Sequence, residues 1–172
     1  MRNLNLRHLA SSPRKLFLIL LLIFGLLFAE SFLDENSFEV RVSRVIDGDT
    51  LEFRNEDNKR VRVRIFGIDA PELKQKFGRE SKMRLASLVQ GRRVVIVLKN
   101  KDKYGRLVAM LKLDAKDVGR EMVRQGWAWA DDYFTRIYAG EQKAARAEKR
   151  GLWQDKNPTK PYEWRKKFKE QR

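Results

Sequence analysis

The chain contains no cysteine, and its only histidine, His8, lies near the N-terminus. Without cysteine there is no thiol nucleophile, no thiolate-bound zinc site and no disulfide bond. The absence of histidine from the rest of the chain excludes mechanisms that need an imidazole there as base, nucleophile or metal ligand. Any chemistry must therefore be done by carboxylates, arginines, lysines and tyrosines.

Acidic residues are also few in comparison with basic ones. The 172 residues include 38 lysines and arginines against 23 aspartates and glutamates, which gives a net charge of +15. Residues 1–35 contribute only +1 of this charge, so the excess lies in the body of the chain. A body this basic attracts polyanions. Nucleic acid is the leading candidate partner, and an anionic membrane surface is the alternative.

One long apolar run follows a short basic flank near the N-terminus. Residues 16–29 carry no charge, and Arg14 and Lys15 precede them. This pattern is typical of an export signal or of a retained membrane anchor. Fourteen helical residues would span about 21 Å, less than a hydrocarbon core of about 30 Å. An anchor would need residues 16–33, whereas the sequence from Ala29 to Ser31 has the small-x-small pattern of a cleavage site, and both alternatives stay open.

Both alternatives place the body of the chain outside the cytoplasm, because the basic flank stays on the cytoplasmic side. We expect a membrane-anchored protein with an extracytoplasmic domain, or a secreted one if the segment is cleaved. A buried core helix is disfavoured because the segment is apolar on every face. The expected regions are a signal peptide or anchor plus linker at 1–35, a folded domain at 36–165 and a basic tail at 166–172.

Five segments have the pattern of β-strands. In residues 60–68, apolar residues alternate with arginines, so one face is apolar and the other carries three arginines. Three arginines on one face cannot form core, so that face meets solvent or a ligand. The predicted strands are residues 38–46, 50–54, 60–68, 93–99 and 106–113.

Three segments are predicted to be helices, and each ends at or near a glycine. Five strands interrupted by one helix, with further helices afterwards, predict an α+β fold that is mainly a small closed β-barrel. The OB-fold is a five-stranded barrel that binds nucleic acids. A doubly wound α/β fold is disfavoured because no helices separate the first three strands. The N-terminal hydrophobic helix would precede this barrel, and the predicted helices of the domain are residues 79–90, 117–125 and 138–150.

The stretch from Asp47 to Glu72 concentrates the candidate chemistry. Asp49 and Asp69 lie at the ends of apolar runs, as do Glu72 and Arg64. Neighbouring carboxylates repel each other unless a cation or a proton lies between them, and oxygen-rich sites suit hard cations such as calcium. An arginine fork suits a phosphate. These residues predict a metal-assisted site for phosphate chemistry, and the alternative is a hairpin with Asp-Gly turn chemistry and solvated charges.

Four blocks of the sequence, in residues 45–50, 64–72, 102–106 and 123–126, resemble the staphylococcal nuclease, or thermonuclease, family. The resemblance covers roughly residues 38–165, and the blocks have the order and internal spacing of that family. It implies an OB-type barrel with three helices and calcium-dependent hydrolysis of DNA and RNA phosphodiester bonds that leaves 3′-phosphates. The end of the chain, up to Trp164 and Arg165, is similar to exported bacterial members. We expect a monomer with DNA and RNA as substrates.

The resemblance also implies roles for individual residues. The carboxylates of Asp49 and Asp69 would bind Ca²⁺ together with the backbone carbonyl of Ala70, where the family often has threonine. Glu72 would activate the attacking water. The residues that would bind the scissile phosphate are Arg64 and Arg106.

Substrate contacts outside the scissile phosphate are implied for Lys103 and Tyr104, which would meet the neighbouring phosphate and nucleotide. Tyr133 is the candidate for the tyrosine that stacks on the nucleotide. The loop after Glu72 is shorter than in the best-known member of the family, which bears on substrate preference and not on the reaction.

Other residues near these blocks have structural interpretations. Asp47 and Asp102 stand in turn contexts and are interpreted as turn or capping residues. Trp127 and Trp129 are interpreted as core or barrel-rim residues, because aromatic side chains are mostly buried.

The main alternative function is a non-catalytic OB-fold module that only binds nucleic acid. Such a module needs basic and aromatic residues but not three carboxylates and two arginines together. A membrane-surface protein would likewise leave the carboxylates without a role. The complete set of residues therefore favours an enzyme, a phosphodiesterase.

Overall fold

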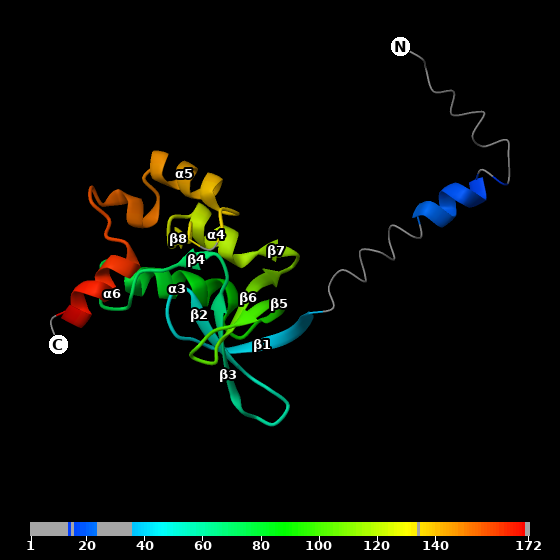
Figure 1. Cartoon of the computed structure of the whole chain (residues 1–172), viewed down its shortest axis with the longest axis horizontal. Coiled ribbons are helices and arrows are strands. Elements are labelled where there is room, and N and C mark those ends of the chain that lie inside the picture. Colours follow the sequence, from blue (N-terminus) through cyan, green and yellow to red (C-terminus); the bar gives the residue numbers. More distant parts are fainter. Residues whose placement is uncertain (1–13, 15, 24–35, 134, 171–172) are drawn as a thin grey trace, which may run out of the picture. The chain divides into compact units, whose positions relative to one another are not determined.

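The protein is described here by a computed structural model (Figure 1), which describes residues 14, 16–23, 36–133 and 135–170. The chain divides into two compact units, residues 1–35 and residues 36–172. In the first unit, residues 16–23 are helical. No helix within the described ranges has the length and apolar character needed to cross a membrane. The rest of the predicted signal or anchor, with its cleavage pattern, lies outside the described residues, so its fate stays a prediction.

The second unit is built around a six-stranded sheet of order β3-β2-β1-β5-β6-β7, and a parallel pairing between β3 and β6 closes it into a barrel. Five strands form the barrel wall, since β7 has only two residues. The strands are β1 (Ser37–Val45), β2 (Thr50–Arg54), β3 (Arg60–Ile65), β5 (Arg93–Lys101), β6 (Leu107–Leu113) and β7 (Lys116–Asp117). The predicted α+β fold with a five-stranded OB-type barrel is confirmed.

The alternation of apolar and charged residues explains the β2–β3 hairpin. Leu51 pairs with Val63, and both side chains are fully buried inside the barrel. On the outer face of the same hairpin, Glu52 pairs with Arg62, whose Nε lies 3.0 Å from the Glu52 carboxylate. A slip of one residue would exchange the two faces, so burial of the apolar face determines the register.

The third predicted strand extended too far, to residue 68. In the structure β3 ends at Ile65, because Gly67 adopts φ +78° and turns the chain. The residues beyond this turn form a short strand, β4 (Ile68–Asp69), which pairs antiparallel with β8 (Trp129–Ala130) outside the barrel sheet. Asp69 is therefore held by a separate small sheet.

Helices cover the barrel on more than one side. Those predicted near 79–90, 117–125 and 138–150 are present, although the last is shorter and is followed by a 3₁₀ turn. A further helix, α6, was not predicted, and the boundary expected between residues 165 and 166 falls inside it. In Figure 1, α4 and α5 lie together, with α6 apart from them. The helices are α3 (Gly78–Val89), α4 (Val118–Arg124), α5 (Ala139–Ala147), η1 (Gly151–Gln154) and α6 (Pro161–Glu170).

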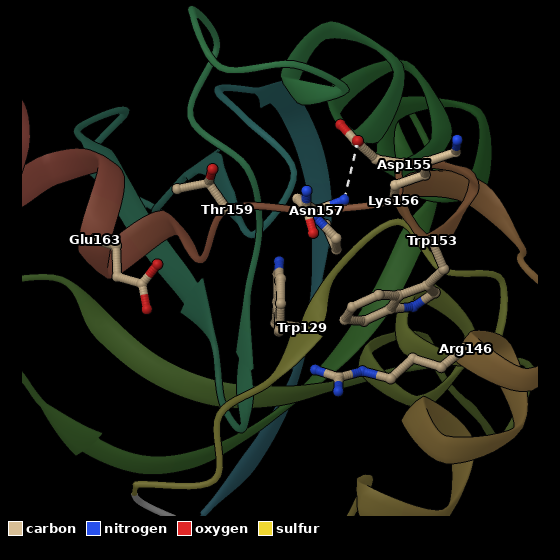
Figure 2. Close-up of a pocket in the computed structure, with 9 residues that line it drawn as sticks. Trp129, Arg146, Trp153, Asp155, Lys156, Asn157, Thr159 and Glu163 are labelled. Carbon is tan, nitrogen blue, oxygen red and sulfur yellow. Dashed lines mark hydrogen bonds between the residues drawn. The ribbon is translucent and has the colours of Figure 1, made fainter.

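Two apolar clusters stabilise this arrangement. The larger fills the barrel and the space under α3 and α4, where Leu85 and Met122 are fully buried. The smaller contains Trp129 and Trp153, whose ring centroids are 4.4 Å apart. Figure 2 shows the Arg146 side chain reaching toward both rings. Trp129 is thus a packing residue, as interpreted from the sequence, and it joins β8 to the segment that leads to α6.

Candidate active site

The carboxylate of Asp49 is held at the mouth of the barrel by three hydrogen-bond or ionic contacts, one with each of three residues. Its Oδ1 lies 2.8 Å from Arg64 Nη1 and accepts a hydrogen bond from the Thr50 hydroxyl at 2.8 Å. Its Oδ2 accepts from the Ala70 N–H at 2.9 Å. Asp49 is only 4% exposed. A buried carboxylate is costly unless it is paired and hydrogen-bonded, and Asp49 is both.

The turn that carries Asp49 lies directly against α3. A Cβ atom at Gly48 would come within 1.9 Å of Ser81 Oγ, so only glycine fits there. Ser81 in turn donates a hydrogen bond to the Trp127 carbonyl at 2.6 Å. The helix therefore limits the movement of the turn and of Asp49.

Arg64 joins Asp49 to Asp69 across the gap between β3 and β4. Its Nη2 lies 3.0 Å from Asp69 Oδ1 and 3.3 Å from the Ile68 carbonyl. Burial alone would lower the pKa of Arg64, but the charges of Asp49 and Asp69 outweigh burial and raise this pKa. Two carboxylates, one from the turn before β2 and one from β4, thus meet on one guanidinium group.

Asp47 adds a third carboxylate to this region. Its Oδ1 accepts the Asp49 N–H at 3.0 Å, the contact of a turn residue, in agreement with the sequence interpretation. Burial, followed by the negative charge of Asp49, raises the pKa of Asp47 to about 7. Burial and the neighbouring Asp49 carboxylate together therefore disfavour the charged form of Asp47.

This crowding of carboxylates fits a hard cation. Asp49 and Asp69 supply oxygen ligands, the Ala70 carbonyl is the predicted third, and a positive ion would relieve the repulsion that raises the pKa of Asp47. Across the ranges that the structure describes, no three acidic, histidine or cysteine side chains form a ready-made metal cluster. A cation here would depend on two carboxylates and the backbone.

Glu72 lies at the same site but is held by a residue that sequence reasoning missed. Arg165 of α6 places Nη1 2.9 Å from Glu72 Oε1 and 3.1 Å from Asp69 Oδ1, and its Nη2 lies 3.1 Å from Asp69 Oδ2. Burial would lower the pKa of Arg165, but hydrogen bonds to Asp69 and Glu72 raise it. These partners are more than 90 residues apart in sequence, so no local spacing could reveal the contact.

Arg106 comes from the turn between β5 and β6. Its Nε donates to Asp102 Oδ2 at 2.8 Å, and Asp102 also accepts the N–H groups of Tyr104 and Arg106. Burial would raise the pKa of Asp102, but the hydrogen bonds from Arg106 hold it below its ordinary value. Asp102 is thus a structural residue of the turn, as interpreted from the sequence.

One cavity of about 580 Å³ gathers most of the predicted site residues. Tyr104, 70% exposed, stands at its edge with the Arg106 guanidinium carbon 5.5 Å from the centre of its ring. The cavity is open and strongly polar, as a site for an anionic polymer requires. It is lined by Asp47, Asp49, Arg62, Arg64, Ala70, Pro71, Glu72, Tyr104, Arg106 and Arg165.

Two predicted substrate contacts line neighbouring hollows. Lys103 lines a hollow of about 400 Å³ together with Tyr104 and Arg64. Tyr133 lines another, of about 710 Å³, together with Arg64 and Asp69. A fourth hollow, drawn in Figure 2 around Trp129 and its neighbours, contains no predicted site residue.

Known proteins resemble this chain along most of its length. The model of a family described as staphylococcal nuclease homologue matches residues 62–155. An uncharacterized endonuclease of Haemophilus influenzae is 42% identical over 159 residues, covering 91% of this chain and 88% of that protein. An uncharacterized endonuclease of Escherichia coli is 41% identical over 128 residues, 73% of this chain and 83% of that protein. A staphylococcal-like nuclease of Arabidopsis thaliana is 36% identical over 121 residues, 67% of this chain and 37% of that protein.

We expect Asp49→Ala to lower the free energy of unfolding by about 3–5 kcal/mol, because it leaves the buried guanidinium of Arg64 and the Ala70 N–H without their partner. Urea unfolding in the presence of a chelator measures this effect apart from any bound metal. Glu39→Ala is the matched control, since its ion pair with Arg93 is exposed and worth less than about 1 kcal/mol. Equal losses in the two variants would contradict a structural role for Asp49.

Proposed function

Because this chain belongs to the family of staphylococcal nuclease homologues and is a nuclease, we propose that it hydrolyses phosphodiester bonds of DNA and RNA with calcium and leaves 3′-phosphates. The observation that carries this proposal is the meeting of Asp49 and Asp69 on Arg64. Arg64 and Asp49 line one cavity together with Glu72 and Arg106. Carboxylates for a hard cation and guanidinium groups for a phosphate are thus gathered at one place.

Asp49, Asp69 and the Ala70 carbonyl would hold the calcium ion. When bound, the ion offsets the negative charge of the phosphate and of the transition state. Arg64 and Arg106 bind phosphate oxygens through charge-assisted hydrogen bonds, which strengthen as charge develops on these oxygens. Their planar forks match two oxygens at once, which a lysine ammonium group does not.

Glu72 is proposed as the base. It accepts a proton from the attacking water, whose oxygen forms the new bond to phosphorus. The phosphorus–O5′ bond breaks, so the phosphate stays on the 3′ oxygen and the released 5′ oxygen takes up a proton. Arg165 holds the Glu72 carboxylate in the cavity before substrate arrives, which positions it without making it a metal ligand.

Removal of calcium tests the metal. The full chain is expected to degrade single-stranded DNA in calcium and to stop in excess chelator, because the phosphate charge is then no longer offset. Acid-soluble nucleotide release measures the rate, and activity restored by added calcium controls for unfolding in chelator. Equal rates with calcium and with chelator would remove the metal from the proposal.

Substitution at Glu72 and Arg106 tests the roles of the protein groups. Glu72→Gln and Arg106→Lys should each lower kcat roughly 10²–10³-fold while oligonucleotide binding is retained, because each loses an interaction that acts in the transition state. Glu80→Gln and Arg93→Lys are the matched controls, because they make the same two substitutions at exposed positions outside the cavity. If both site variants keep the full rate, the proposed roles are wrong.

Export is proposed from the N-terminal segment alone, from its basic flank and the charge-free run 16–29. The mature protein should begin near Ser31 if the segment is a cleaved signal and at the original N-terminus if it is an anchor. N-terminal sequencing of the protein from its native cell separates the two, and a full-length protein in the cytoplasm would contradict both.

A further inference from the structure

We propose that the hollow beside α6 continues the active site and binds single-stranded nucleic acid through a tyrosine platform and a basic wall. The proposal rests on the nuclease function above and adds to its site a substrate-binding surface beside α6. The hollow, of about 710 Å³, is larger than the cavity that holds Glu72 and Arg106. Its size falls within the roughly 300–1,000 Å³ of known ligand pockets.

The hollow is continuous with the active site through shared residues. Arg64 and Arg165 line both this hollow and the active-site cavity. Asp69, which contacts both of these arginines, lines the hollow as well. A strand whose phosphate contacts Arg64 is therefore next to the hollow. The contact of Arg165 with Glu72 brings α6 to the site, so α6 forms one wall of the substrate path.

The chemistry of the α6 wall suits a phosphate backbone. Lys160 and Arg165 line the hollow, and the Lys160 ammonium group lies 5.8 Å from the centre of the Trp129 ring, which holds it at the wall. Residues 156–172 contain seven lysines and arginines against two glutamates. Asp131 and Asp132, on the segment after β8, also line the hollow. Phosphates are attracted to the basic residues at α6 and repelled by these two carboxylates.

Two tyrosine rings supply surface for bases. Tyr162 is 63% exposed and Tyr133 is 88% exposed, and both line the hollow. Large exposed aromatic rings in a basic groove are the usual platforms for unpaired bases. The ring of Trp129 is covered by Trp153 and Arg146, so it forms the floor of the hollow and is not a platform. Bases can stack on tyrosine only when they are unpaired, so the ligand is a single strand.

The test compares two substrates with the full chain in calcium. A single-stranded thymidine octanucleotide can fill the hollow, whereas bis(4-nitrophenyl) phosphate offers the same reacting group without a nucleotide. Tyr162→Ala should raise the ratio of KM for the octanucleotide to KM for the ester roughly tenfold, which is the loss of about one stacked base. Lys160→Ala should raise the same ratio several-fold, and its effect should shrink at high salt.

Lys166→Ala is the matched control. It removes the same charge from α6, which directly follows Lys160, but Lys166 does not line the hollow, so the ratio should change less than twofold. Tyr162 is mostly exposed, so its removal leaves the core intact, and an unchanged melting temperature checks this. A ratio unaffected by Tyr162→Ala, or one that Lys166→Ala raises equally, would overturn the proposal.

Failure of the proposal for the hollow and failure of the nuclease proposal can be told apart. If the chain cleaves both substrates but the variants leave the KM ratio unchanged, only the role of the hollow is refuted. If the chain cleaves neither substrate, the proposed reaction is wrong. Fluorescence anisotropy with a labelled octanucleotide then still tests binding in the hollow. Tyr162→Ala should then weaken octanucleotide binding roughly tenfold, while a labelled duplex of the same length binds wild type and variant alike.

Discussion

The structure of the site depends on one buried ionic contact, the bridge that Arg64 makes between Asp49 and Asp69. The two carboxylates come from different parts of the fold, one from the turn before barrel strand β2 and one from the β4–β8 pair. Each carboxylate would be costly to bury alone. If the guanidinium group of Arg64 moved away, the two negative charges would repel each other without compensation. The interaction that organises the site is therefore also the one that a phosphate and a cation must rearrange when they bind.

The same constraint explains why the surrounding elements are arranged as they are. Gly48 allows α3 to approach the turn before β2, and Gly67 turns the chain out of the barrel so that β4 can pair with β8. The Trp129–Trp153 contact then brings the C-terminal segment back toward the site, where Arg165 joins the carboxylates. The barrel provides rigidity, and the elements outside it complete the chemistry.

Much of the fold could be predicted because its causes are local. Strict alternation of apolar residues with arginines predicts β3, and glycines after helical runs predict where helices end. The site residues of the Asp47–Glu72 stretch are close in sequence, so strand ends place them near each other. Prediction failed where the partner lay elsewhere in the chain. The expected strand to residue 68 is broken by the turn at Gly67, and Ile68 and Asp69 instead form β4, which pairs with β8, about 60 residues later.

By itself, the sequence determined the chemical repertoire. The chain has no cysteine, a histidine only at His8 and a basic body, and it carries carboxylates and arginines at strand ends. Residue types and short spacings are enough to establish these features. Only the tertiary structure decided that Arg165 holds Glu72, and that Tyr133 and Tyr162 face one hollow. The physical reason is distance along the chain. Contacts between segments so far apart depend on how whole elements pack, and no local periodicity or spacing encodes them.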